Sequence, residues 1–156
     1  MGILNVTPDS FYDGGRFLNH DRAVERGMQM EDEGADIIDV GGESTRPGAE
    51  PVQAGDEIDR VCPVIEKLAK NAGVPVSIDT CKSEVAREAI QCGAVMVNDI
   101  SGLEFDDRIA GTAARGDAYL VISHMRGTPG SMQDNPVYDD ILDDIFPKSG
   151  MALKRP

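Results

Sequence analysis

Five short runs rich in valine and isoleucine alternate along the chain with longer segments that carry apolar residues at helical spacing. Each run is apolar almost throughout, rather than at every second position. That pattern is typical of strands in parallel sheets that are covered on both faces. The predicted strands comprise residues 2–6, 36–40, 75–79, 94–100 and 118–123.

Helices are predicted between these strands because apolar residues recur there at intervals of three and four. The strongest stripe runs over residues 58–72. Pro63 lies inside this stripe and is expected either to bend the helix or to mark its first turn. A shorter stripe over 85–90 is predicted to end at Gly93, and a weaker one near Val24 and Met28 to end before Gly34.

This alternation of strand and helix requires right-handed crossovers and a parallel sheet. Two architectures fit, an open doubly wound sheet and a closed barrel. An open sheet concentrates its polar site residues at one switch point, whereas a barrel draws them from the ends of several strands. Polar residues lie at the carboxyl end of every predicted strand, and they comprise Asn5, residues 43–46, Asp79, Thr80, Asn98, Asp99 and His124. We therefore predict an α/β fold, a parallel (β/α) barrel of the TIM type.

The length of the chain limits how much of such a barrel it contains. A complete barrel takes roughly 250 residues, and this chain has 156. The prediction is therefore an incomplete barrel with about five of the eight strands, formed by a domain over residues 1–146. Residues 147–156 are basic and interrupted by proline and glycine, and are predicted to be a loose tail.

Charge and composition narrow the classes of partner. A formal net charge of -13 with a pI near 4.4 opposes unassisted binding to nucleic acid or to an anionic membrane surface. No stretch approaches the roughly 20 apolar residues of a membrane helix, and no signal peptide is visible. Three widely spaced cysteines without a CxxC pair fit reduced thiols and a cytoplasmic protein.

Two long motifs are similar to signatures of the dihydropteroate synthase family. They are NVTPDSFYDGG at 5–15 and GADIIDVGGESTRPG at 34–48, and the match continues through SIDTCK (77–82), VNDISG (97–102) and SHMRGTPGSMQ (123–133). The resemblance runs from residue 2 to about 145. It implies a barrel enzyme that condenses a dihydropterin diphosphate with 4-aminobenzoate and releases diphosphate in folate biosynthesis. Full-length members of the family are expected to be homodimers.

The resemblance implies that Asp79 and Asn98 bind the edge of the pterin, and that Ile100 and Met125 contact its ring. Acids and amides at strand ends suit a ring edge that carries both donors and acceptors. The residues alone leave other interpretations open. Asp79 could instead cap a helix that begins near Lys82, and Asn98 could simply end a strand.

Diphosphate departure leaves negative charge that requires a cation. Arg46 is the candidate, since its guanidinium matches phosphate oxygens, and Thr45 adds a hydroxyl. By resemblance, Asn5 contacts a magnesium–diphosphate unit, so Mg²⁺ is the expected cofactor and Asn5 its candidate ligand. Alternatively, Arg46 is an ordinary surface arginine, Asn5 a turn former, and His124 a hydrogen-bonded structural residue rather than a phosphate contact.

The segment that follows the first predicted strand is too polar for a core. In the family it is a mobile loop over the site, where Pro8, Asp9, Phe11 and Asp13 help bind the arene and stabilise the cationic pterin. Carboxylates favour a nearby cation, and one aromatic ring excludes water. By the same resemblance, Pro47 belongs to a second loop that closes the other side.

Parts of the family's site come from strands six to eight, and no position of this chain corresponds to them. They are an aspartate for the pterin, a lysine that bridges both substrates, and an arginine–histidine pair for phosphate. We therefore expect this chain alone to lack activity. Two other interpretations are open. One is a non-catalytic piece that binds pterin or phosphate. The other is a methyltetrahydrofolate-binding methyltransferase domain, although those methyltransferases lack the two loop signatures.

Overall fold

The computed structural model describes residues 1–7, 16–44 and 51–125, together with positions 127, 137, 139, 140 and 142. Its strands are β1 (Gly2–Asn5), β2 (Ile38–Gly41), β3 (Val76–Asp79), β4 (Met96–Asp99) and β5 (Tyr119–Ile122). Its helices are α1 (Arg16–Asp32), α2 (Ala54–Asn71), α3 (Ser83–Gln91) and α4 (Arg108–Arg115). None of the described helices is long and apolar enough to cross a membrane. The tail predicted at 147–156 lies outside the described residues.

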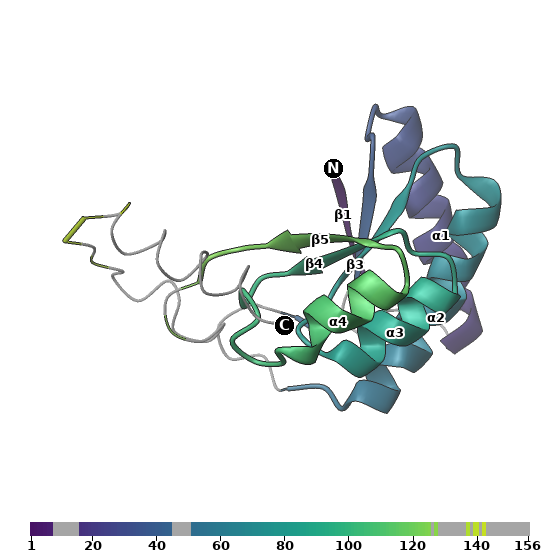
Figure 1. Ribbon diagram of the computed structural model, residues 1–156. Coiled ribbons are helices and arrows are strands. Elements are labelled where there is room, and N and C mark those ends of the chain that lie inside the picture. The colour runs from purple at the N-terminus through teal and green to yellow at the C-terminus, as the bar shows by residue number, and fades with distance from the viewer. Residues whose placement is uncertain are drawn as a thin grey trace.

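The sheet has the topology of a barrel wall. All of its strands pair in parallel, and their spatial order, β1-β2-β3-β4-β5, is the same as their order along the chain. A doubly wound sheet would reverse direction at a switch point, so this alternative is excluded for the described strands. Figure 1 shows the helices gathered on one side of the curved sheet, which leaves the other side to face the inside of a barrel.

The predicted strands and helices are present, with shorter strands and one helix that the sequence pattern missed. Pro63 lies inside α2, well after its first residue, Ala54, so the alternative that it marks the first turn is wrong. Helix α4 was missed because it buries only Ile109, Thr112 and Ala113. A stripe that thin gives a weak periodic signal.

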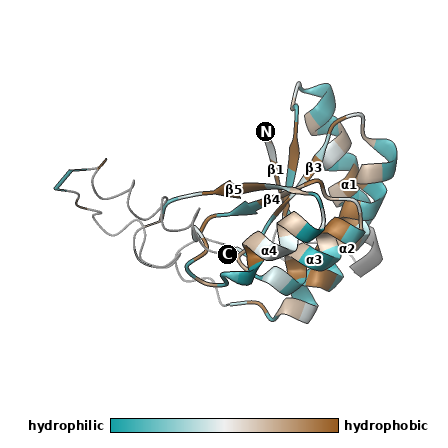
Figure 2. Cartoon of the chain, in the orientation of Figure 1, coloured by the Kyte–Doolittle hydropathy of each residue, from teal (hydrophilic) through white to brown (hydrophobic). Residues whose placement is uncertain are grey.

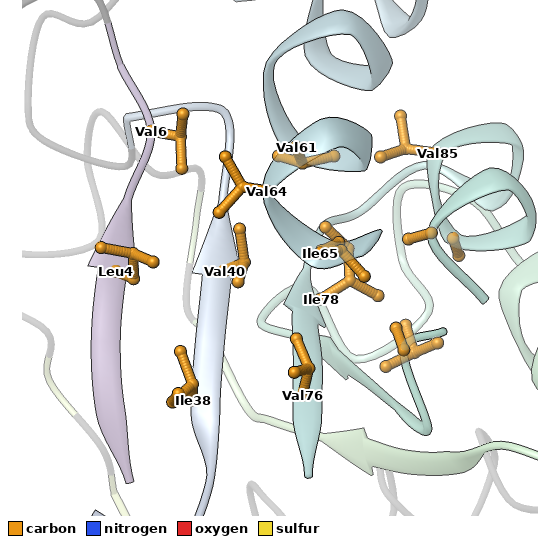
Figure 3. Close-up of a cluster of buried hydrophobic side chains, with 14 of the residues drawn as sticks. Leu4, Val6, Ile38, Val40, Val61, Val64, Ile65, Val76, Ile78 and Val85 are labelled. Carbon is orange, nitrogen blue, oxygen red and sulfur yellow. The ribbon is translucent and has the colours of Figure 1, made fainter. Parts of the chain in front are cut away.

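The core lies between the sheet and the helices. Leu4, Val40 and Ile78 occupy one row across neighbouring strands and are buried together. From the helical side, α2 contributes Val61 and Ile65, which face the same row in Figure 3. Figure 2 shows hydrophobic colour along β5, hydrophilic colour at the end of β4 and both colours on the helices, as expected for helices that cover one face of a sheet.

The two faces of the sheet differ in how they are covered. Strand β2, which lies between β1 and β3, is buried on both faces, as its apolar run predicted. On the edge strands the prediction is wrong, because Ile3 of β1 and Tyr119 of β5 remain 64% and 73% exposed. Both residues point away from the helices, since their neighbours Leu4 and Leu120 pack in the core.

Helix α3 ends in a Schellman motif, as the glycine signal predicted. The Ala94 N–H donates to the Ala89 carbonyl and the Gly93 N–H to the Ile90 carbonyl, both at 3.0 Å. Gly93 has a φ of +111°, and a Cβ added there would lie 2.7 Å from the Cβ of Ala69. Two constraints therefore require glycine at this turn, the left-handed backbone and the close contact with α2.

Gly93→Ala should lower the free energy of unfolding by about 2 kcal/mol or more, because strain in the left-handed conformation adds to the clash. Gly34→Ala is the matched control, since Gly34 has a φ of +99° but nothing within 4 Å of an added Cβ. That variant should lose only about 1 kcal/mol. Urea unfolding of the two variants compares them, and equal losses would mean that the contact with Ala69 is unimportant.

Candidate functional site

Polar side chains from neighbouring strands share one row at the carboxyl end of the sheet. Asn5 pairs with Gly41, Gly41 with Asp79, and Asp79 with Asn98. The preceding row, which includes Leu4 and Ile78, packs against the helices, so the polar row faces the opposite side. Three of the predicted site residues, from β1, β3 and β4, therefore lie on one face and at one level.

The side chains of Asn5 and Asp79 lie close to Gly41 within this row. A Cβ at Gly41 would lie 3.5 Å from both Asn5 Oδ1 and Asp79 Oδ2. The side chains of Asn5 and Asp79 thus flank the glycine across two strand spacings. The row therefore brings an amide oxygen and a carboxyl group together over the backbone of one glycine.

Asn98 is fixed by an acid that the sequence reading missed. Its side-chain Nδ2 donates to Oδ2 of Asp39 at 3.0 Å. Asp39 lies on β2 and is only 2% exposed. The available signal was an aspartate inside the otherwise apolar run IIDV at 37–40. Asn98 therefore does more than end a strand, because its amide is part of a buried polar contact on the site face.

Asp79 does not cap the helix that follows it. The backbone N–H of Ser83, the first residue of α3, donates to Oδ2 of Asp106 at 2.9 Å. The helix-cap interpretation of Asp79 is therefore wrong, and its carboxyl stays on the site face. Hydrogen bonds from Arg108 and Ser83 lower the pKa of Asp106, as its capping role requires.

The pKa of Asp79 is raised to about 7. Burial is the largest cause, followed by the nearby carboxylates of Asp39, Glu57, Asp99 and Glu43. Near neutral pH this side chain therefore exchanges between a carboxylate that accepts hydrogen bonds and a neutral acid that also donates one. Strongly perturbed acids at the carboxyl ends of strands are typical of binding and catalytic sites.

An ion-pair cluster lies beside the row and was also missed. Lys82 Nζ binds Oε2 of Glu57 at 2.5 Å and also binds Glu43. Glu57 is fully buried, and Oε1 of Glu43 accepts from the Val52 N–H at 3.1 Å. Burial acts to lower the pKa of Lys82, but hydrogen bonds with the two glutamates outweigh it and raise the pKa. The cluster joins the end of β2, helix α2 and the start of α3.

Asp99 follows Asn98, but its side chain points to the opposite face of the sheet. Its carboxylate accepts from the Ser101 N–H at 2.9 Å, from the Ser101 hydroxyl at 2.7 Å and from the Leu103 N–H at 2.7 Å. Leu103 has a φ of 66°. Asp99 is buried and holds the turn after β4, so this acid at a strand end is structural.

The other predicted site residues divide by whether the structure describes them. Ile100 is half-buried directly after β4, and Met125 is buried three residues after the end of β5. His124 is half-buried and has partners. The remaining predicted site residues lie outside the described residues, and they are Pro8, Asp9, Phe11, Asp13, Thr45, Arg46 and Pro47.

Within the described ranges there is no group of three or more histidine, cysteine, aspartate or glutamate side chains that could hold a metal ion. The oxygen of Asn5 nevertheless suits Mg²⁺, a hard cation that typically takes one or two protein oxygens and completes its shell with water and substrate phosphates. The cysteines of the chain are free, and Cys62 and Cys92 pack against the core.

Comparisons with known proteins agree with this geometry. The family described as "Pterin binding enzyme" matches residues 1–149. The dihydropteroate synthase of Synechocystis sp. is 48% identical over 145 residues, which cover 93% of this chain and 50% of that protein.

The solved structures that this chain resembles are also dihydropteroate synthases. A crystal structure of dihydropteroate synthase from Clostridium difficile, in the presence of pteroic acid, superposes with a TM-score of 0.88 at 47% identity and covers 99% of this chain and 56% of that chain. The enzyme from Xanthomonas albilineans with 4-aminobenzoic acid gives a TM-score of 0.84 at 40% identity, covering 98% and 53%. The chain thus spans about half the length of the relatives it matches, and the prediction of an incomplete TIM-type barrel is confirmed.

Proposed function

The chain belongs to the pterin-binding enzyme family, and from that premise we propose that the protein containing these five β-α units is a dihydropteroate synthase. In the proposed reaction the amine of 4-aminobenzoate forms a C–N bond to the methylene carbon of a dihydropterin diphosphate. The C–O bond to diphosphate breaks, the amine loses a proton, and diphosphate leaves. The observation that carries the proposal is the row Asn5, Gly41, Asp79 and Asn98 on one face of the sheet.

In this proposal Asp79 and Asn98 bind the edge of the pterin. A pterin edge presents N–H donors beside acceptors, and a carboxylate with a fixed amide matches that pattern. A buried site of this kind rejects analogues that leave its polar groups unpaired. Ile100 and Met125 supply the apolar contacts to the ring, in keeping with their positions after β4 and β5.

The diphosphate would be held at the β1 and β2 end of the row. Asn5 is the proposed protein ligand of Mg²⁺, together with oxygens of the substrate, and the ion would neutralise charge on the leaving diphosphate. Arg46 and Thr45 would bind the phosphate oxygens. Gly41, which has no side chain, lies between Asn5 and Asp79 at this end of the row.

The arene is assigned to the two loops that follow β1 and β2. Pro8, Asp9, Phe11, Asp13 and Pro47 are proposed to bind 4-aminobenzoate and to stabilise the cationic pterin formed as diphosphate departs. Both loops leave from the carboxyl ends of adjacent strands, which is where barrel enzymes bind their substrates. A cytoplasmic location and a homodimer remain predictions.

A hybrid protein tests the proposal. It joins residues 1–149 of this chain to the part of the Synechocystis enzyme beyond its match. With dihydropterin diphosphate, 4-aminobenzoate and magnesium, we expect a coupled assay to detect diphosphate release by the hybrid and negligible release by the 156-residue chain. A folded hybrid that binds no pterin would overturn the proposal. A hybrid that binds pterin without releasing diphosphate would favour the non-catalytic alternative.

A further inference from the structure

We propose that Asp39 is a positioning residue that fixes the side-chain amide of Asn98 in one orientation and thereby determines which pteridines the site accepts. The inference rests on the proposed function, because it concerns how the same site recognises its substrate. It adds a residue of β2 that does not need to touch the ligand.

The contact spans the width of a strand. Asp39 on β2 and Asn98 on β4 are separated by β3, yet Nδ2 of Asn98 lies 3.0 Å from Oδ2 of Asp39. Asp39 is paired in register with Ser77, two residues before Asp79 and on the same face of the sheet. The carboxylate therefore reaches up and across the site face to the amide. It reaches Asn98 from below, on the side away from the carboxyl ends where a ligand would enter.

The chemistry of the pair allows one orientation of the amide. Oδ2 of Asp39 accepts the hydrogen bond from Nδ2 of Asn98, so the NH₂ group of Asn98 faces the acid. A rotated amide would place its carbonyl oxygen against the oxygens of Asp39 and lose this hydrogen bond in a part-buried environment. Asn98 therefore presents its carbonyl oxygen and its remaining N–H to the ligand in a fixed order.

Asp39 has no other structural task in the described part of the chain. Its second oxygen, Oδ1, is buried and has no hydrogen-bond partner among the described residues, and the same holds for the hydroxyl of Ser77 beside it. A buried acid retained for stability alone would be expected to have its oxygens satisfied. The one described side-chain hydrogen bond of Asp39 is the bond that orients Asn98.

The test replaces Asp39 by asparagine in the hybrid protein. An asparagine at 39 can pair with either end of the Asn98 amide, so that amide becomes free to rotate. The probes are 6-hydroxymethylpterin and 2,4-diamino-6-hydroxymethylpteridine, in which an amino group replaces the ring carbonyl oxygen. Calorimetry should show that D39N binds the pterin about tenfold more weakly and prefers it over the diamino compound at least about fivefold less.

Ser77→Ala is the matched control, because Ser77 is equally buried on the same face and bonds to nothing described. It should change both affinities by less than about twofold. Equal weakening of both ligands in D39N, or no change in either, would overturn the inference. If the unaltered hybrid binds neither pteridine, the proposed function fails first and the inference fails with it.

A measurement on the unaltered hybrid keeps the inference testable even if D39N does not fold. The side-chain amide of Asn98 can be assigned by NMR as the signal that Asn98→Ala removes. We expect one of its two protons to exchange slowly with solvent, because it is bonded to buried Asp39. Rapid exchange of both protons would contradict a fixed orientation.

Discussion

Replacing Lys82 with methionine should lower the free energy of unfolding of this chain by about 3 kcal/mol at pH 7. Methionine keeps the apolar stem of the side chain but removes the ammonium group that binds Glu57 and Glu43. Glu57 is fully buried, and its Oε1 already has no described partner. Without Lys82 an uncompensated charge is left in the core, which costs far more than the loss of a surface ion pair.

Two further variants isolate this cause. Lys70→Met removes a pair with Glu66 in which the two side chains are 67% and 56% exposed, and it should change stability by at most about 0.5 kcal/mol. Adding Glu57→Leu to Lys82→Met should restore most of the loss, since no buried charge remains. Urea unfolding measures the free energy of unfolding of each variant. If the double variant is as unstable as Lys82→Met alone, the buried charge of Glu57 is not the cause of the loss.

Replacing Asp79 with asparagine should weaken binding of 6-hydroxymethylpterin to the hybrid protein by about a hundredfold or more. In the proposed site the Asp79 carboxylate would accept hydrogen bonds from two adjacent N–H groups of a pterin edge, whereas the asparagine amide turns one acceptor into a donor. A mismatch of this kind leaves polar groups unpaired in a buried site. Calorimetry measures the effect, and unchanged affinity would remove Asp79 from the proposed site.

The same variant should be more stable than the parent protein at high pH. Because the pKa of Asp79 is raised to about 7, the folded protein holds a proton that the unfolded chain has already lost. The free energy of unfolding therefore falls as the pH rises from the unfolded pKa of about 4 to the folded pKa. Asp79→Asn has no such penalty, so its advantage should be absent near pH 4 and reach about 2 kcal/mol above pH 8.

Urea unfolding at pH 4 and pH 8 tests this difference in the hybrid protein. Asp79→Asn and the parent protein should be similar at pH 4 and diverge at pH 8. A constant difference at both values would show that asparagine acts through packing rather than through charge. Together with the loss of binding, this result would show that Asp79 lowers the stability of the folded protein at high pH but is required for pterin binding.

The sequence located the site through rules that act over a few residues. Strands and helices differ in the period of their apolar positions, and the polar residue that ends a parallel strand lies at the same edge as its neighbours. That was enough to place Asn5, Asp79 and Asn98 together. It did not separate Asn98 from Asp99, because the sequence reading grouped both as strand-end polar residues, although alternation sends their side chains to opposite faces.

The amino-acid sequence by itself determined the five strands, three of the four described helices, the barrel class and the residues that end the strands, because these follow from local periodicity and length. Only the tertiary structure decided which acids become partners of those residues. Asp39 and Asn98 are 59 positions apart, and Glu57 and Lys82 are 25 apart. Contacts at such separations depend on how strands and helices pack. The local pattern of the chain therefore could not reveal the hydrogen bond between Asp39 and Asn98 or the ion pair between Glu57 and Lys82.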